Sequence, residues 1–282
     1  MKIGRNSQCP CKSGKKYKNC CAQSGTPAVD FGNIAGIAVA PEARQVFLVT
    51  KDILLNTLRR DGPIAARSFD QLHEGDLLEM SELLGTTCFL LTQGFKEVTE
   101  KNDELRIACG SLCWNAINTF IGATSLLRDS YYLQSSILVR SILETMATAM
   151  HLIMTPTDLI RFKGNKLELK ATIPSAKKIV PPFGHMYGMF SETFVHIGSL
   201  HGKPQPVGPH REDSEELSAV LTFLRFSIWL IFVTVELLFA DMMQNGKYWE
   251  KIAPGQIQWR PTDATIEWQE KFLRANPPKQ KL

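Results

Sequence analysis

Residues 217–243 read LSAVLTFLRFSIWLIFVTVELLFADMM, and this strongly apolar stretch decides the fold of the chain. Its uncharged run, residues 226–235, is shorter than the roughly 20 apolar residues that a membrane-spanning helix needs. Arg225, Glu236 and Asp241 interrupt the longer stretch. We therefore expect a central buried helix with other helices packed around it, and no membrane span.

Apolar residues recur at helical spacing on both sides of this segment, from about residue 70 onward. The pattern predicts one interrupted helix or two over residues 68–101, further helices over 104–127, 130–154 and 184–202, and a last short helix after Pro254. Ser214, followed by Glu215 and Glu216, is a typical start for the apolar helix because its hydroxyl can cap the first turn. Residues 164–184 carry Lys-rich polar stretches and two adjacent prolines, which predict a long loop or a short irregular insertion.

Residues 25–70 form a mixed segment between the N-terminus and the helical body. Residues 34–40 (IAGIAVA) fit either a short strand or the buried start of a helix, and their periodicity does not decide. Residues 46–60 read as an amphipathic helix that ends at Asp61, Gly62 and Pro63. We expect a mainly α fold, with a small zinc knuckle over residues 1–24, the mixed segment over 25–70, and a helical bundle domain over 71–282.

The composition is that of an ordinary soluble globular protein, with 44% hydrophobic and 21% charged residues among 282. The net charge of +4 is unevenly placed, because residues 1–25 carry six basic residues and no Asp or Glu. We therefore expect an acidic partner to bind this segment. The N-terminus is basic and polar with no apolar h-region after it, so we expect a cytoplasmic protein.

Four cysteines lie close together in residues 3–21, IGRNSQCPCKSGKKYKNCC, with the spacing C-x-C-x8-C-C. We predict that one zinc ion is bound by the thiolates of Cys9, Cys11, Cys20 and Cys21. A segment this short buries almost no apolar area, so metal coordination would supply its folding free energy. Four thiolates also accept iron. The alternative is a disulfide or unpaired thiols, and the strain of a bridge between Cys20 and Cys21 disfavours it.

This segment closely resembles the SEC-C motif, the metal-binding tail of the bacterial preprotein-translocase motor SecA. The residues that match its pattern are Arg5, Asn6, Cys9, Cys11, Ser13, Gly14, Lys16, Tyr17, Lys18, Cys20 and Cys21. The fourth ligand is Cys21, where the translocase tail often has His. The resemblance implies a docking element for a protein or ribosomal partner, with a contact surface of Arg5, Lys12, Lys15, Lys16 and Lys18. No ATP-binding loop of the form GxxxxGK[ST] is present in the sequence, which excludes the motor function.

In the helical body, Arg140 and Glu144 are four residues apart and therefore share one helix face. Their apolar neighbours indicate partial burial, so the two form either a structural ion pair or a charged pair that faces a cleft. A second group of polar residues comprises His185, Tyr187, Ser191, His196 and His201. Tyr187, Ser191 and a histidine could line a site, although a histidine placed like His196 is more often a hydrogen-bonded core residue.

The R-S-x-L-E helix around Arg140 and the later segment S-E-x-F-V-H-I resemble a family of uncharacterised bacterial helical proteins. That family is loosely related to HEPN bundles, many of which cleave RNA in toxin and phage-defence systems. The resemblance implies Arg140, Glu144 and His196 as catalytic candidates. HEPN nucleases carry R-x(4–6)-H within one helix, and no His follows Arg140 at that spacing. Cys109 and Cys113, with Cys88 nearby, read as buried small hydrophobes rather than as a second metal site.

Two functions follow from these features. The first is a non-enzymatic adaptor, in which the zinc module docks on a protein or ribosome and carries a helical effector or scaffold. The alternative is a defence-type ribonuclease that the basic module recruits to RNA by attraction to phosphates.

Overall fold

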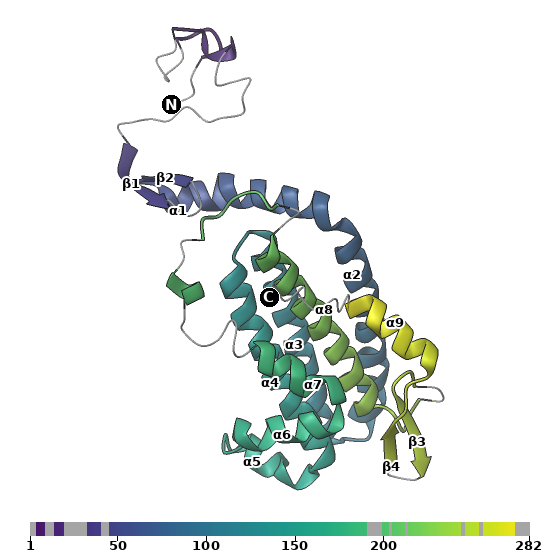
Figure 1. The fold of residues 1–282 in the computed structure, drawn as a ribbon. Coiled ribbons are helices and arrows are strands. Elements are labelled where there is room, and N and C mark those ends of the chain that lie inside the picture. The colour runs from purple at the N-terminus through teal and green to yellow at the C-terminus, as the bar shows by residue number, and fades with distance from the viewer. Residues whose placement is uncertain are drawn as a thin grey trace, which may run out of the picture. The chain divides into compact units, whose positions relative to one another are not determined.

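The structure is a computed structural model of the 282-residue chain. It describes residues 4–8, 14–19, 33–40, 45–190, 199–202, 205–211, 214–243, 246–253 and 256–273. The chain divides into two compact units, residues 1–61 and residues 62–282. The prediction of a mainly α fold is confirmed, because most of the second unit is helical (Figure 1).

The first unit contains a 3-10 turn, Tyr17–Asn19, and an antiparallel hairpin of β1 (Ile34–Ala40) and β2 (Gln45–Thr50). Of the two alternatives for residues 34–40, the strand is therefore the one observed. The helix predicted over 46–60 is wrong in its first part, where β-branched residues pair with β1, and helical backbone begins only at α1 (Ile53–Asn56). A five-residue π-helical turn, Thr57–Asp61, ends the unit.

The second unit is a helical bundle with one small hairpin. Its elements are α2 (Gly62–Glu100), α3 (Glu104–Arg128), α4 (Tyr132–Met154), α5 (Leu159–Lys163), α6 (Leu169–Ile179), α7 (Pro181–Phe190), α8 (Glu215–Leu238), β3 (Trp249–Ala253), β4 (Gln256–Trp259) and α9 (Asp263–Leu273). The helices α2, α3 and α4 pack side by side in that order, and α8 packs against all three (Figure 1). The predicted helices over 104–127 and 130–154 and the last short helix are confirmed.

Helix α8 is the centre of the core, as residues 217–243 predict. Its N-cap is Ser214, whose Oγ accepts a hydrogen bond from the backbone N–H of Leu217 at 3.2 Å. Every residue from Phe223 to Leu238 is buried. Helices α4 and α8 are both long and apolar enough to cross a membrane by length and composition alone, but 83% of the apolar window of α8 is buried inside the protein. Burial against neighbouring helices thus accounts for the apolar character of α8, at about 1.5–3 kcal/mol for each large side chain.

The loop predicted over residues 164–184 is wrong, because α6 and the start of α7 occupy most of it. The two adjacent prolines stand at the first two positions of α7. A proline is well placed there, since the first N–H groups of a helix have no intrahelical acceptor. Pro174 lies inside α6, on its exposed side. Residues 191–198, the second half of the helix predicted over 184–202, lie outside the described residues.

Helix α2 begins earlier than predicted and is kinked. The predicted segment 68–101 is the larger part of a 39-residue helix, and His73 interrupts it with non-helical backbone angles (φ −126°, ψ 24°). Sharp kinks in helices have local causes and often mark functional positions. The kink therefore makes His73 a candidate functional residue.

The hairpin of β3 and β4 is attached to the C-terminal half of α8 by buried polar contacts. Glu236 of α8 accepts a hydrogen bond from the backbone N–H of Tyr248 at 3.0 Å. The indole of Trp229 donates to the Tyr248 hydroxyl at 2.8 Å, and the indole of Trp249 donates to the backbone carbonyl of Val233 at 2.9 Å. These contacts satisfy polar groups that burial would otherwise leave without hydrogen bonds.

Candidate functional site

Within the cysteine module, the structure describes residues 4–8 and 14–19. The four predicted ligands, Cys9, Cys11, Cys20 and Cys21, and the predicted contact residue Lys12 lie outside the described residues. These two segments form an antiparallel contact: Gln8 and Lys16 make a β-bridge, and the backbone N–H of Lys18 donates to the carbonyl of Arg5 at 3.0 Å. Gly14 has a φ of 72°, a left-handed angle that glycine adopts without strain.

The described part of the module fits a metal-organised fold. None of its residues, 4–8 and 14–19, is buried, so this part has no hydrophobic core of its own. The bridge between Gln8 and Lys16 brings together the chain segments that lead into Cys9 and Cys20, and consecutive Cα atoms are 3.8 Å apart. Four cysteine thiolates are a donor set that zinc prefers in structural sites.

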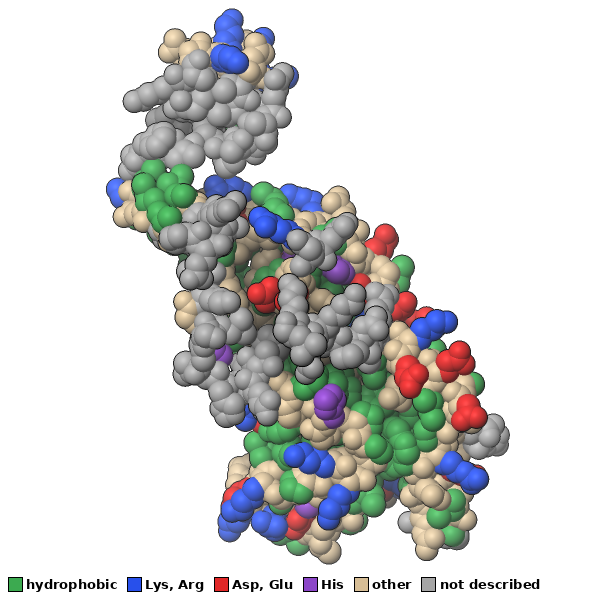
Figure 2. All heavy atoms as spheres, viewed as in Figure 1, with side chains coloured by type: hydrophobic (Ala, Val, Ile, Leu, Met, Phe, Trp, Pro, Cys, Tyr) green, Lys and Arg blue, Asp and Glu red, His purple; other side chains and the backbone are tan. Residues whose placement is uncertain are grey.

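The electrostatic character of the module is uniformly positive. Arg5, Lys15 and Lys16 are exposed and Lys18 is half-buried, and residues 1–25 contain no carboxylate. Figure 2 shows blue side chains and no red ones on the described atoms of this module. Positive side chains around a tetrathiolate centre offset its negative charge and also attract acidic partners.

In the helical body, Arg140 and Glu144 lie on α4 and contact each other directly. The Nε of Arg140 donates to Glu144 Oε1 at 2.6 Å, and the two side chains are 34% and 21% exposed. The hydrogen bond to Glu144 is the main cause that raises the pKa of Arg140, and Tyr187 of α7 adds to the same shift. The structure thus brings together Arg140, Glu144 and Tyr187 from two predicted groups.

Two other members of the second group, His185 and His201, are among the described residues. His185 is exposed on α7 and His201 is partly exposed, while Ser191 and His196 lie outside the described residues. Cys109 and Cys113 are buried in the core, where desolvation raises the pKa of the Cys109 thiol to about 12. In the part of the chain that the structure describes, no group of three or more His, Cys, Asp or Glu side chains could hold a metal ion.

A polar cluster that the sequence analysis did not predict lies between α2 and α8. The Nδ1 of His73 is 3.0 Å from Asp76 Oδ2, and the other oxygen of Asp76 accepts from Nε and Nη2 of Arg225 at 3.0 and 2.7 Å. Arg225 also donates to Glu79 Oε2 at 2.6 Å and to the carbonyl of Phe272 at 2.8 Å. Arg225 is only 1% exposed, so its charge is compensated entirely inside the protein.

Two small cavities flank this cluster. One, of about 150 Å³, is lined by His73, Asp76, Ser214, Leu217, Ser218, Leu221, Thr222 and Arg225. Because a carboxylate can only accept a hydrogen bond, Asp76 fixes the proton of His73 on Nδ1. The Nε2 atom is buried and has no hydrogen-bond partner among the described groups. Asp76 therefore fixes the orientation of the His73 ring.

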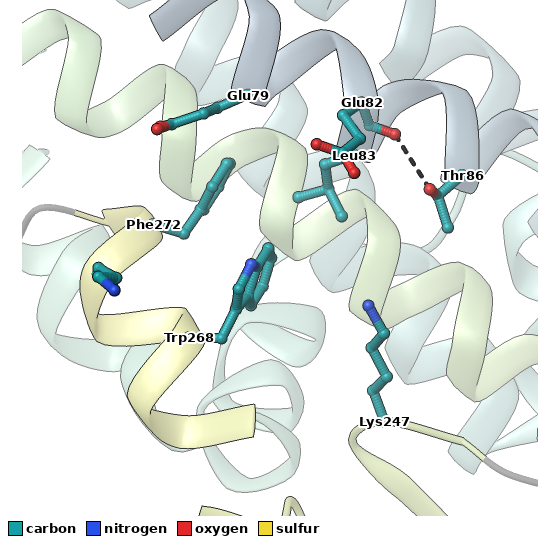
Figure 3. Close-up of a pocket in the computed structure, with 8 residues that line it drawn as sticks. Glu79, Glu82, Leu83, Thr86, Lys247, Trp268 and Phe272 are labelled. Atoms are coloured by element: carbon teal, nitrogen blue, oxygen red, sulfur yellow. Dashed lines mark hydrogen bonds between the residues drawn. The ribbon is translucent and has the colours of Figure 1, made fainter. Parts of the chain in front are cut away.

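The second cavity, of about 190 Å³, lies between α2 and α9 (Figure 3). Glu79, Glu82 and Thr86 line it from α2, and Trp268 and Phe272 line it from α9. The Trp268 ring stacks on Phe272, and the Nζ of Lys247 lies 5.4 Å from the Trp268 ring centre. The indole is thus already engaged by protein groups and is a poor platform for a planar ligand.

The His73 cluster had a weak signal in the sequence. Arg225 stands out as the one basic residue in an apolar helix, and a buried charge requires a partner. Its partner Asp76 is 149 residues away in the chain, a distance that no local pattern bridges. Arg67 and His73 also have the R-x(4–6)-H spacing that is missing after Arg140, although Arg67 is exposed.

Comparison with known proteins finds similarity only for the N-terminal cysteine module of this chain. Residues 5–23 match the SEC-C motif, so the chain carries this motif at its N-terminus. Over 25 residues the module is 72% identical to the protein translocase subunit SecA of Wolinella succinogenes and 71% identical to that of Carboxydothermus hydrogenoformans. Over 24 residues it is 75% identical to SecA of Campylobacter curvus.

These matches cover 8–9% of this chain and 3% of each SecA chain. The similarity therefore concerns a small module and says nothing of the helical body. No solved structure matches the chain.

Proposed function

We propose that this protein is a metal-dependent docking protein. Its SEC-C module binds one zinc ion through Cys9, Cys11, Cys20 and Cys21 and attaches the helical body to a protein or ribosomal partner. The match of residues 5–23 to the SEC-C motif is the observation that carries this proposal. The absence of any buried residue in the described part of the module supports it, because a segment without a core needs another source of folding free energy.

The basic side chains of the module would make the partner contact. Arg5, Lys12, Lys15, Lys16 and Lys18 present positive charge on a segment with no carboxylate, which suits an acidic protein surface or ribosomal RNA. Arginine adds planar, bidentate hydrogen bonding to carboxylates or phosphates. Attraction of this kind weakens as salt rises.

Co-sedimentation with purified ribosomes, followed by pull-down with acidic protein fractions, tests the docking role. We expect a variant with Lys15, Lys16 and Lys18 changed to Glu to lose binding, and Cys20→Ser to lose both metal and binding. A matched control changes three exposed lysines of α6, Lys170, Lys177 and Lys178, to Glu and should bind normally. Binding that survives loss of the metal and reversal of the module's charge would refute the proposal.

A defence-type ribonuclease is the second candidate, and the geometry of His73 favours it. The imidazole of His73 is hydrogen-bonded to Asp76 and His73 lines a small cavity, two features that a histidine acting as a general base requires. Incubation with total RNA tests this function beside His73→Ala, Arg140→Ala and His196→Ala. Cleavage that any of these variants abolishes, while folding is kept, would support it. RNA that stays intact with the unmodified protein would remove it.

A further inference from the structure

The outward face of α3 has an unusual composition for an exposed helix. From residue 107 to residue 127 the chain contains no charged residue, yet one side of this helix faces away from the core. The exposed residues along it are Ser111, Trp114, Asn115, Asn118, Ile121 and Ser125. Solvent-facing helix surfaces are normally rich in charge, so an uncharged stripe more than three turns long indicates a contact surface.

The neighbouring helices continue this uncharged face on both sides. Helix α2 contributes Leu78, Ser81, Gly85, Phe89 and Thr92, and α4 contributes Gln134, Ile137 and Ser141. Five of the large apolar side chains on the face are 36–65% exposed: Leu78, Phe89, Trp114, Ile121 and Ile137. Together these residues form what we call the α2–α3–α4 face.

The charged side chains at the two ends of α3 and on the α4 margin of this face have partners within the chain. At one end of α3, Arg106 pairs with Asp241, and at the other end Arg128 pairs with Asp70. On the margin formed by α4, Arg140 pairs with Glu144. An uncharged centre with an exposed aromatic residue and a charged rim is the anatomy of a protein–protein interface.

Two hydroxyl groups of this face are already hydrogen-bonded within their own helices. Those of Thr92 and Ser111 donate to the carbonyl oxygens of the preceding helical turns, at 2.7 and 2.8 Å. Hydroxyls that are satisfied within their own helix leave no unpaired donor when another surface covers them. Covering these two hydroxyls therefore leaves no unpaired donor at their positions.

We infer that the α2–α3–α4 face binds a second copy of this chain. A charged partner would find no complementary charge at the centre of the face, which excludes nucleic acid and acidic or basic proteins. Two copies related by a two-fold axis place uncharged surface against uncharged surface, and the side chain of Asn118 near the middle of α3 can hydrogen-bond to its equivalent. The exposed amides disfavour a lipid surface, where an unpaired polar group is costly.

The size of the face is sufficient for a small specific interface. From Leu78 to Thr92 the helix rises about 21 Å, and three helices about 9 Å apart give a patch of roughly 25 by 25 Å. Two such patches bury about 1,200 Å², which is the lower end of the range for specific interfaces. We therefore expect a dimer with a dissociation constant in the micromolar range.

Sedimentation velocity across a concentration series from about 1 to 200 µM tests this inference. The full chain should change from 31.6 kDa to twice that mass. Asn118→Arg replaces an exposed polar residue and should raise the dissociation constant at least 10-fold, because like charges then meet across the axis. Trp114→Glu should act in the same direction, and Ile160→Arg on α5, at an 81% exposed site off the face, should not change it.

Far-UV circular dichroism of each variant confirms that the helical body stays folded. A chain that remains at 31.6 kDa throughout the series overturns the inference. Self-association that both Asn118→Arg and Trp114→Glu leave unchanged overturns it as well, because the contact would then lie elsewhere on the molecule.

Discussion

At the scale of single residues, the stability of the helical body depends strongly on Arg225. This side chain is 1% exposed and is held by Asp76, Glu79 and a backbone carbonyl. Removing its guanidinium takes away the cation that neutralises a buried carboxylate, which costs about 3–5 kcal/mol. We predict that Arg225→Ala lowers the free energy of unfolding by that amount in urea titration.

A surface arginine provides the matched control for this variant. Arg260 pairs with Glu250 at 2.8 Å, but the two side chains are 68% and 50% exposed. Such pairs contribute less than about 1 kcal/mol. A loss for Arg225→Ala as small as that for Arg260→Ala would contradict the buried network as described.

Gly246 stands where the hairpin of β3 and β4 meets α8. A Cβ atom at this position would lie 2.4 Å from the carbonyl oxygen of Trp249 and 2.5 Å from Glu236 Oε1. Gly246→Ala must therefore displace buried groups, and we predict a loss of about 1–3 kcal/mol in thermal or urea unfolding. Gly188→Ala in α7, where nothing lies within 4 Å of the added atom, should be neutral or slightly stabilising. Equal effects of the two variants would show that the hairpin is not held closely against α8.

At the scale of elements, His210 attaches the segment 205–211 to the bundle. Its backbone N–H donates to Ser68, its Nε2 donates to the carbonyl of Arg128 at 3.0 Å, and its Nδ1 accepts from the Tyr132 hydroxyl at 3.0 Å. Desolvation by burial lowers the pKa of His210 below its ordinary value of 6.5. The neutral form is therefore the one that the folded state prefers.

This shift predicts how stability depends on pH. Because the pKa of His210 is lower in the folded protein, the unfolded chain takes up the proton first as the pH falls. His210 therefore contributes fully to the free energy of unfolding above about pH 6.5, and this contribution decreases below that pH. We expect His210→Gln to be less stable than the unmodified protein by about 1–2 kcal/mol at pH 7.5, and the gap to narrow by pH 5. A gap that stays constant over this range would exclude titration of His210.

Sequence patterns predicted the elements with strong apolar periodicity and missed those set by pairing or backbone chemistry. α3, α4 and α8 follow from their apolar spacing and from the cap at Ser214. β2 was mistaken for a helix because residues 46–60 alternate too briefly before the strand gives way to α1. α6 and the first three residues of α7 were missed because prolines suggested a loop, although a proline can start a helix. The rest of α7 lies in the helix predicted over residues 184–202.

The candidate sites also differ in how far they could be predicted from local sequence patterns. The SEC-C motif can be recognised in the sequence because its cysteines and basic residues lie within one short, dense pattern. The contact of Arg140 with Glu144 follows from helical spacing, whereas the approach of Tyr187 to that pair depends on how α7 packs. The link from His73 through Asp76 to Arg225 joins two helices far apart in the chain, so only the folded structure reveals it.

At the scale of the whole molecule, the helical body and the cysteine module differ in how much apolar surface they bury. The helical body has a continuous core built from α2, α3, α4 and α8. The described residues of the cysteine module have no buried side chain. Removing the metal should therefore unfold the module and leave the body intact.

Treatment with a strong chelator under reducing conditions checks this separation. We expect the helical far-UV signal and the melting temperature of the body to change little, within about 2 °C, while proteolysis at the N-terminus becomes faster. Loss of most of the helical signal on chelation would mean that the metal organises the body as well.

The metal content of the untreated protein is the most direct test of whether the cysteine module binds a metal ion. Elemental analysis by mass spectrometry, combined with a thiol count under native conditions, measures it. We predict one zinc ion per chain, a value near zero for Cys9→Ser and Cys20→Ser, and an unchanged value for Cys88→Ser in α2. A chain that contains neither zinc nor iron, or in which these four sulfur atoms are joined in disulfides, would contradict the account.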